Sequence, residues 1–247
     1  MERKHFLRQG LSALGVIAIA PLTMACKKDT DTNSGSDAGS GSGSGTGGNS
    51  CTAAPTETEG PFPTHTPSSY VRSDIRDDRT GVPLTVNITI QNVNNSCAVL
   101  AGVIVDIWHC DKDGYYSEYG GTGMQSVNYT AVHFLRGRQT TDANGLVTFT
   151  TIFPGWYSGR ATHIHVHVYN VSGTSLKITQ IAFPEGSSSP TVVVNTTATG
   201  YTKGMSGYTS NANDNVFSDD TAGVEIAAVT GSVSGGYTLS QVIKVAA

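Results

Sequence analysis

The sequence predicts an all-β fold: a β-sandwich of mostly antiparallel strands with long loops, preceded by a signal peptide and a flexible tether. Helical periodicity is scarce after residue 50, and short runs rich in β-branched and aromatic residues recur instead. Turn sequences such as DKDG at 111–114 and DANG at 142–145 separate these runs. Short strands at close spacing, punctuated by Gly, Asp and Asn turns, are typical of a β-sandwich.

Seven strands are expected in a single domain over residues 51–247. They cover residues 83–93, 99–110, 146–153, 162–171, 176–183, 191–196 and 223–231. The stretch 201–220 is polar and irregular, which predicts a long loop with at most one helical turn. A domain of this length buries roughly 70% of the surface of its unfolded chain, enough for a substantial core.

The first 25 residues have the layout of an export signal. A basic start precedes the apolar run 11–20, which is shorter than the ~20 residues of a membrane-spanning helix. The segment RKHFLR resembles a twin-arginine export signal with Lys4 in place of the second Arg. The segment LTMAC resembles a bacterial lipobox, which predicts acylation of Cys26. The alternative is an ordinary cleavable signal that leaves Cys26 without lipid.

Residues 27–50 consist mainly of Ser, Gly, Asp and Thr. No large apolar side chain there can contribute to a core, so we expect a flexible tether. With lipid on Cys26, this tether would hold a soluble domain away from a membrane surface. The expected localisation is the cell envelope, either periplasmic or anchored to the membrane through Cys26.

Charge and cysteine content limit the partners and the compartment. The formal net charge is −4 and no Lys/Arg cluster follows the signal, which argues against nucleic acid as a partner. Cys51 and Cys97 both lie in polar, loop-like sequence, and outside the cytoplasm we expect them to pair. Cys110 lies in a strand-like run and is expected to pack as a small hydrophobe.

His163, His165 and His167 alternate along the expected strand 162–171. Residues two apart share a strand face, so the imidazoles point one way and the aliphatic residues between them point into the core. The alternative is a solvated polar face of an edge strand. A His-x-His pair can bind a single metal ion, and neutral imidazole suits zinc, copper and iron alike. The two-His-one-carboxylate arrangement of ferrous oxygenases would need a carboxylate beside the pair, and Asp106 lies on a strand of its own.

Four motifs extend this pattern over most of residues 57–183. They are TEGPFP (58–63), VDIWHCDKDGYYSEY (105–119), FLRGRQTTDANGLVTFTTIFPGWYSGRATHIHVHV (134–168) and ITQIAF (178–183). Together they resemble the intradiol ring-cleavage dioxygenases, the group of protocatechuate 3,4-dioxygenase and catechol 1,2-dioxygenase. The resemblance implies cleavage of a catechol-type ring by O₂ at a non-haem ferric iron, giving a cis,cis-muconate-type diacid.

The resemblance also implies that two tyrosinates and two histidines hold the Fe(III). The matching positions are Tyr116, Tyr157, His163 and His165. Tyr115 competes for the first position, and the family pattern, with the ligand just before Ser, favours Tyr116. A phenol of pKa ~10 binds metal at neutral pH only when a strong Lewis acid displaces its proton, and Fe(III) is such an acid.

By resemblance, Arg160 and Gln180 flank the substrate, where a fixed guanidinium favours the negative charge that develops on the ring. Tyr157 would be the ligand that the substrate displaces, and its phenolate would take up a substrate proton. The segment TEGPFP would line the mouth of the site. His167 lies two residues beyond His165 along the strand and is interpreted as a residue at the rim of the site rather than a metal ligand.

Two other functions stay open from the sequence. One is a β-sandwich binding module that keeps the scaffold without turnover, and the other is a zinc or copper site on the histidines. For the leading interpretation the expected partners are a small aromatic diol and O₂. The accepted ring substituents and the number of subunits do not follow from the sequence.

Overall fold

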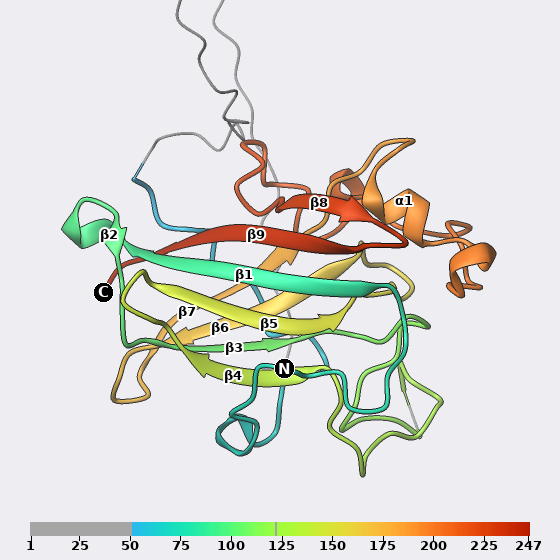
Figure 1. Ribbon diagram of the computed structural model, residues 1–247, viewed down its shortest axis with the longest axis horizontal. Helices are drawn as coiled ribbons and strands as arrows, with labels where there is room; N and C mark the ends of the chain where they lie inside the picture. Colours follow the sequence, from blue (N-terminus) through green and yellow to red (C-terminus); the bar gives the residue numbers. More distant parts are fainter. Residues whose placement is uncertain (1–50, 122) are drawn as a thin grey trace, which may run out of the picture. The chain divides into compact units, whose positions relative to one another are not determined.

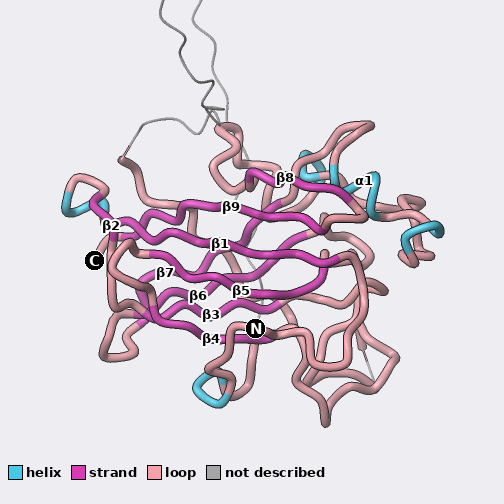
Figure 2. The backbone as a smooth tube through the Cα atoms, in the orientation of Figure 1, coloured by secondary structure: helices cyan, strands magenta, loops and turns pink. Residues whose placement is uncertain are grey.

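The computed structural model describes residues 51–121 and 123–247, in which two β-sheets lie face to face (Figure 1). The expected signal peptide and tether lie outside the described residues. The predicted all-β sandwich is confirmed, and long loops join many of its strands (Figure 2). No helix among the described residues is long and apolar enough to cross a membrane.

The first sheet is built around the long strand β1. Its strands are β1 (Pro83–Asn92), β2 (Ala98–Val99), β5 (Leu146–Ile152), β8 (Ala228–Ser232) and β9 (Gly236–Val245). On one side β1 pairs antiparallel with β5 and β2, and on the other it pairs parallel with β9. β8 then pairs antiparallel with β9. The β1–β9 pair thus departs from the antiparallel arrangement that predominates elsewhere.

The second sheet carries the candidate site. Its strands are β3 (Ile104–Trp108), β4 (Arg136–Thr140), β6 (His163–Tyr169) and β7 (Ser175–Ala182). They are antiparallel in the order β4-β3-β6-β7. The register places His165 between Trp108 on β3 and Gln180 on β7. Side chains from three strands therefore meet on one face of this sheet.

Strand alternation gives the second sheet two different faces. The face toward the first sheet is apolar, and the core contains Val105, Ile107, Ile164, Val166 and Val168 together with Leu84, Val86, Ile88 and Ile90 of β1. The inward orientation expected for the aliphatic residues of β6 is confirmed. The opposite face carries Trp108, His163, His165 and Gln180, all of them buried. The alternative of a solvated polar strand face is therefore wrong.

Two of the expected strands need correction. Residues 191–196 are not a strand, because Pro190–Val194 form a short helix, α1. The Ser189 side chain accepts a hydrogen bond from the Val192 N–H and Pro190 lies in the first turn, so capping outweighs the β-branched run. The expected strand 99–110 is split into β2 and β3 by a turn in which Gly102 has a φ of 78°.

Two strands that the sequence did not predict complete the sheets. β4 has the sequence RGRQT, and its two arginines, Arg136 and Arg138, point to the site face. The strand therefore lacks the alternation of apolar and polar residues by which a strand is recognised. β9 follows a tight turn after β8, which is itself shorter than the expected strand 223–231. The long loop expected at 201–220 is confirmed, with one 3₁₀ turn at Asn211–Asn213. Further 3₁₀ turns span Pro67–Ser69, Val93–Asn95 and Thr197–Thr199.

A disulfide joins Cys51 to Cys97, which confirms the expected pairing. It ties the beginning of the described chain to the connection between β1 and β2. Cys110 is unpaired and buried, and it packs in a cluster with Phe62, Trp108 and Tyr116. Its expected role as a small packing side chain is therefore also confirmed.

Candidate metal centre

Two imidazoles and a phenol converge on the site face of the second sheet. The Nε2 atoms of His163 and His165 lie 3.1 Å apart, and the Oη of Tyr116 lies 3.2 Å from Nε2 of His163. All three side chains are buried, with at most 1% of each residue exposed. The two histidines come from alternate positions of β6, whereas Tyr116 comes from the loop after β3.

The protonation of these groups suits a metal ion. His163 Nδ1 lies 2.7 Å from the Ala161 carbonyl, which can only accept, so Nδ1 carries the proton and Nε2 presents its lone pair. Burial lowers the pKa of His163 to about 3 and that of His165 well below its usual value, so both rings are neutral at neutral pH. Two donors ~2.1 Å from one ion and at right angles lie ~3.0 Å apart. The observed spacing fits that arrangement.

Burial also raises the pKa of Tyr116 well above 10, and the neighbouring Cys110 and Tyr157 add to this effect. The phenol would therefore keep its proton in this environment unless a strong cation displaced it. Among the described residues, no group of three or more His, Cys, Asp and Glu side chains is arranged to hold a metal. The Tyr116 phenol, 3.2 Å from His163 Nε2, is an oxygen donor placed beside the two histidines.

Tyr157 completes the set from the turn that precedes β6. Its ring centroid lies 5.7 Å from that of His163 and 5.8 Å from that of Tyr116, and the side chain is only partly buried. Burial raises the pKa of Tyr157, while the charge of Arg160 and a hydrogen bond from it act in the opposite direction. The competing Tyr115 instead lies against Tyr129, with ring centroids 6.3 Å apart. The structure therefore gathers Tyr116, and not Tyr115, with the other three predicted ligands.

Arg160 and Gln180, the residues expected to flank the substrate, contact each other. Arg160 Nη2 donates to Gln180 Oε1 at 2.6 Å, and Arg160 Nε donates to both carboxylate oxygens of Asp214 at 2.9 and 3.1 Å. Asp214 is fully buried and also accepts the backbone N–H of Ala161. The guanidinium is therefore held in a fixed orientation beside Tyr157.

Residues 57–65, which we call the covering segment, lie across the site. Phe62 stacks on Tyr116, with ring centroids 4.7 Å apart. Gly60, at a φ of +70°, lies so close to His165 that a Cβ there would stand 2.9 Å from its Cε1. Gln180 Nε2 donates to the Thr58 carbonyl. The segment expected to line the site does so, and it is pinned to the face that carries the histidines.

The third histidine of β6 takes no part in the cluster of donors. His167 Nδ1 lies 3.1 Å from the carboxylate of Glu59 and 2.8 Å from Tyr169 Oη, and Nε2 lies 2.8 Å from Ser175 Oγ. Its contact with the covering segment agrees with the expected rim position. Asp106 forms a two-pronged ion pair with Arg138.

Sequence reasoning missed two residues that shape the site. Trp108 lies parallel to His165 with ring centroids 4.9 Å apart and 2° between the planes. Trp108 is two residues from Asp106 on the same strand, so both side chains lie on the polar face. This spacing can be read from the sequence. Asp214 lies in the irregular loop 201–220, where no motif marks it.

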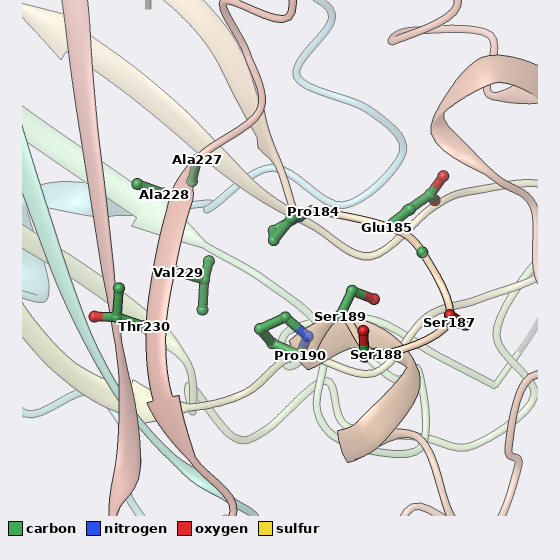
Figure 3. A pocket seen from close by; sticks show the side chains of 11 residues that line it. Pro184, Glu185, Ser187, Ser188, Ser189, Pro190, Ala227, Ala228, Val229 and Thr230 are labelled. Carbon is green, nitrogen blue, oxygen red and sulfur yellow. The ribbon is translucent and has the colours of Figure 1, made fainter. Parts of the chain in front are cut away.

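A separate concavity of about 580 Å³ lies between residues 184–190 and residues 227–230. Pro184 and Pro190 lie on one side of it and Val229 on the other (Figure 3). Glu185 is the titratable side chain of its lining, and that carboxylate already accepts hydrogen bonds from Tyr208 and Asn211. The lining thus offers no group of residues suited to catalysis.

The sequence matches known proteins over the segment that builds this site. A protein-family model described as "Dioxygenase" matches residues 58–219. Catechol 1,2-dioxygenase 1 of Acinetobacter lwoffii is 28% identical over 121 residues, which cover 42% of this chain and 37% of that protein. The match to this curated relative thus spans little more than a third of its length.

Two solved structures resemble the fold. An intradiol ring-cleavage dioxygenase from Tetranychus urticae is 30% identical with a TM-score of 0.68, and the match covers 79% of this chain and 95% of that one. The dioxygenase domain of a dioxygenase carbohydrate-binding protein fusion from Streptomyces sp. SirexAA-E is 26% identical with a TM-score of 0.54, and the match covers 79% and 99% of the two chains. Since the family model spans more than half of the sequence and the mite enzyme matches over nearly its whole length, the chain belongs to the intradiol ring-cleavage dioxygenase family.

Proposed function

We propose that this protein is a non-haem Fe(III)-dependent intradiol dioxygenase, which uses O₂ to cleave a catechol-type ring to a cis,cis-muconate-type diacid. The observation that carries the proposal is the position of Tyr116 Oη and His165 Nε2, which lie 3.2 and 3.1 Å from His163 Nε2, with Tyr157 beside them. Family membership supports the reaction type.

The proposed ligands of Fe(III) are Tyr116, Tyr157, His163 and His165. Two phenolates offset two of its three positive charges, which makes burial of the ion less costly. When bound, ferric iron supplies the Lewis acidity that deprotonates the diol and activates the ring toward O₂. The stacked Trp108 ring and the close approach of Gly60 to Cε1 restrict the orientation of the His165 ring.

The two tyrosines differ in a way that suits different roles. Tyr116 is fully buried beneath Phe62, whereas Tyr157 is only partly buried. Tyr157 is therefore the phenolate that an incoming diol can displace, and its Oη can then accept one of the two diol protons. The nearby Arg160 guanidinium favours the phenolate form of Tyr157 until the proton arrives.

Arg160 and Gln180 act on the substrate ring. The ion pair with Asp214 holds the guanidinium in one orientation, so it needs no rearrangement when negative charge develops on the ring. Phe62 and the rest of the covering segment limit the access of water to the same space.

The experiment that tests this proposal combines metal analysis, spectroscopy and oxygen uptake. The purified full-length protein should contain iron and be red-brown, because tyrosinate-to-iron charge transfer absorbs visible light. It should consume O₂ with a panel of catechols in equal amounts to the diacid formed. A colourless protein with full metal occupancy would contradict the iron assignment. Iron-loaded protein without oxygen uptake would instead identify a binding module.

We also propose that the domain is exported to the cell envelope and anchored by lipid at Cys26, a residue outside the described part of the chain. The Cys51–Cys97 disulfide supports an oxidising compartment. Fractionation of cells that express the full chain should find it in the membrane fraction, and Cys26→Ser should release it. Recovery of the wild-type chain from the cytoplasm would contradict export.

A further inference from the structure

Both arginines buried beside the candidate metal centre are paired with a buried carboxylate. Arg160 pairs with Asp214 at 2.9 Å, and Arg136 lies 3.6 Å from Glu118. Both carboxylates have at most 1% of their side chains exposed. The paired carboxylate offsets much of the charge of each guanidinium, so an anionic ring substituent is attracted less than it would be by an unpaired arginine.

Other cations on the elements around the site are also engaged. Lys112, in the turn before Tyr116, pairs with Asp113. Lys177 on β7 donates to the Ala54 carbonyl and to Thr56, and Lys203 donates to the Trp156 carbonyl. Each of these described ammonium groups thus already has a hydrogen-bond or ion-pair partner.

Acidic side chains, by contrast, surround the Arg160 pair. Glu57 is at the start of the covering segment. Burial raises the pKa of its carboxyl, and the charges of Asp219, Asp214 and Asp220 raise it further, whereas the charge of Arg160 lowers it. Backbone contacts place Glu57 beside β7. Its N–H donates to the carbonyl of Ile178, two residues before Gln180, and the carbonyl of the next residue, Thr58, accepts a hydrogen bond from Gln180 Nε2. The approach to Arg160 and Gln180 is thus bordered by negative charge.

We propose that this site selects catechols whose ring substituent is neutral or cationic and discriminates against catechols with a ring carboxylate, with Glu57 as a specificity-determining residue. The inference rests on the proposed function, whose substrate class it narrows. A carboxylate that enters the site loses water and meets only guanidinium groups that already have carboxylate partners, and Glu57 repels it. An ammonium substituent on the ring would instead be attracted by the Glu57 carboxylate.

The decisive comparison is between 3,4-dihydroxybenzoate and 3,4-dihydroxybenzamide, which have similar shapes and both carry an electron-withdrawing carbonyl. At fixed pH and ionic strength, kcat/KM for the amide should exceed that for the carboxylate by about tenfold or more. The ammonium compound 3,4-dihydroxybenzylamine should also be preferred over the carboxylate. Anaerobic binding of the amide and the carboxylate, followed by visible absorption of the iron-loaded protein, should give the same order of affinity.

Glu57→Gln should reduce the amide-to-carboxylate ratio severalfold in both measurements. Val171→Lys is the matched control, because it makes the same change in net charge at an exposed position in the β6–β7 turn. That control should leave the ratio unchanged. An unchanged ratio in Glu57→Gln would overturn the role of this residue.

The two proposals fail in different ways. Equal kcat/KM and equal binding of the amide and the carboxylate by the wild-type protein would overturn the selectivity and leave the dioxygenase activity intact. Absence of turnover with every diol would overturn the activity, and the binding comparison would still decide the charge preference.

Discussion

Phe62 lies stacked on Tyr116, with ring centroids 4.7 Å apart and 25° between the ring planes. The two residues are 54 positions apart in the sequence, and both are buried. Phe62 also packs edge-on against Tyr119 and Tyr157. Phe62 thus joins the covering segment to the aromatic side chains of the site. Changes in this segment should therefore alter the positions of Tyr116 and Tyr157, two of the proposed ligands.

The choice between two adjacent tyrosines can be tested directly. Tyr116→Phe should lower iron affinity and oxygen uptake by at least about a hundredfold, because it removes a ligand rather than a group that only supports one. Tyr115→Phe is the control, since that ring lies against Tyr129 and away from the histidines. Iron content and visible absorption of the two variants provide the measurement. Equal loss of iron in both would contradict the assignment of Tyr116.

Gly60→Ala should disturb the His165 ring. A Cβ at Gly60 would stand 2.9 Å from His165 Cε1, and the φ of +70° adds a backbone cost of about 1–2 kcal/mol. Gly173→Ala is the control, because it has a φ of +84° and open space around its Cβ. Both variants should lose stability in thermal unfolding. Only Gly60→Ala should release iron faster to a chelator, and retention equal to that of Gly173→Ala would contradict the predicted displacement.

Asp214→Asn should be strongly destabilising. It leaves the buried Arg160 guanidinium without its carboxylate, a change that costs about 3–5 kcal/mol in the free energy of unfolding. Asp77→Asn breaks the more exposed pair with Arg72 and should cost less than about 1 kcal/mol. Urea unfolding of the two variants measures the difference. Similar small losses in both would show that Asp214 contributes little to holding Arg160.

Glu225 should make stability depend on pH. Burial raises the pKa of its carboxyl to about 8, and the charges of Glu57 and Asp220 add to this effect. Between pH ~4.5 and 8 the folded protein keeps a proton that the unfolded chain releases, so this residue should lower stability by roughly 1.4 kcal/mol per pH unit as the pH rises.

Glu225→Gln should remove this slope. The free energy of unfolding of the variant, relative to the wild type, should therefore increase from pH 5.5 to pH 7.5. A difference that stays constant over this range would show that the carboxyl titrates normally in the folded protein.

Local sequence patterns predicted the strands that carry the chemistry. Period-two alternation in β6 placed three histidines on one face and three aliphatic residues on the other, because side chains of a strand alternate whatever lies around them. The same rule holds for Trp108 and Asp106, although only the register of β3 against β6 shows that Trp108 lies opposite His165.

Other elements depended on distant contacts. The β-branched run 191–196 has the composition of a strand, yet a serine cap and a proline turn it into α1. The sequence did not predict β4, because its arginines occupy positions where an apolar residue would mark a strand. Arg136 points toward Glu118 and Arg138 toward Asp106, both on other elements. A charged strand of this kind is recognised only once its partners are known.

The sequence by itself predicted the sandwich and the disulfide partners, since alternation and turn residues are local properties of the chain, and the resemblance of its motifs supplied the four candidate ligands. The tertiary structure decided that Asp214 holds Arg160 and how Tyr116 and residues 57–65 lie against the histidines. These facts depend on contacts between segments that are 47 or more residues apart. No local pattern encodes such contacts, because they arise only when the folded sheets bring the segments together.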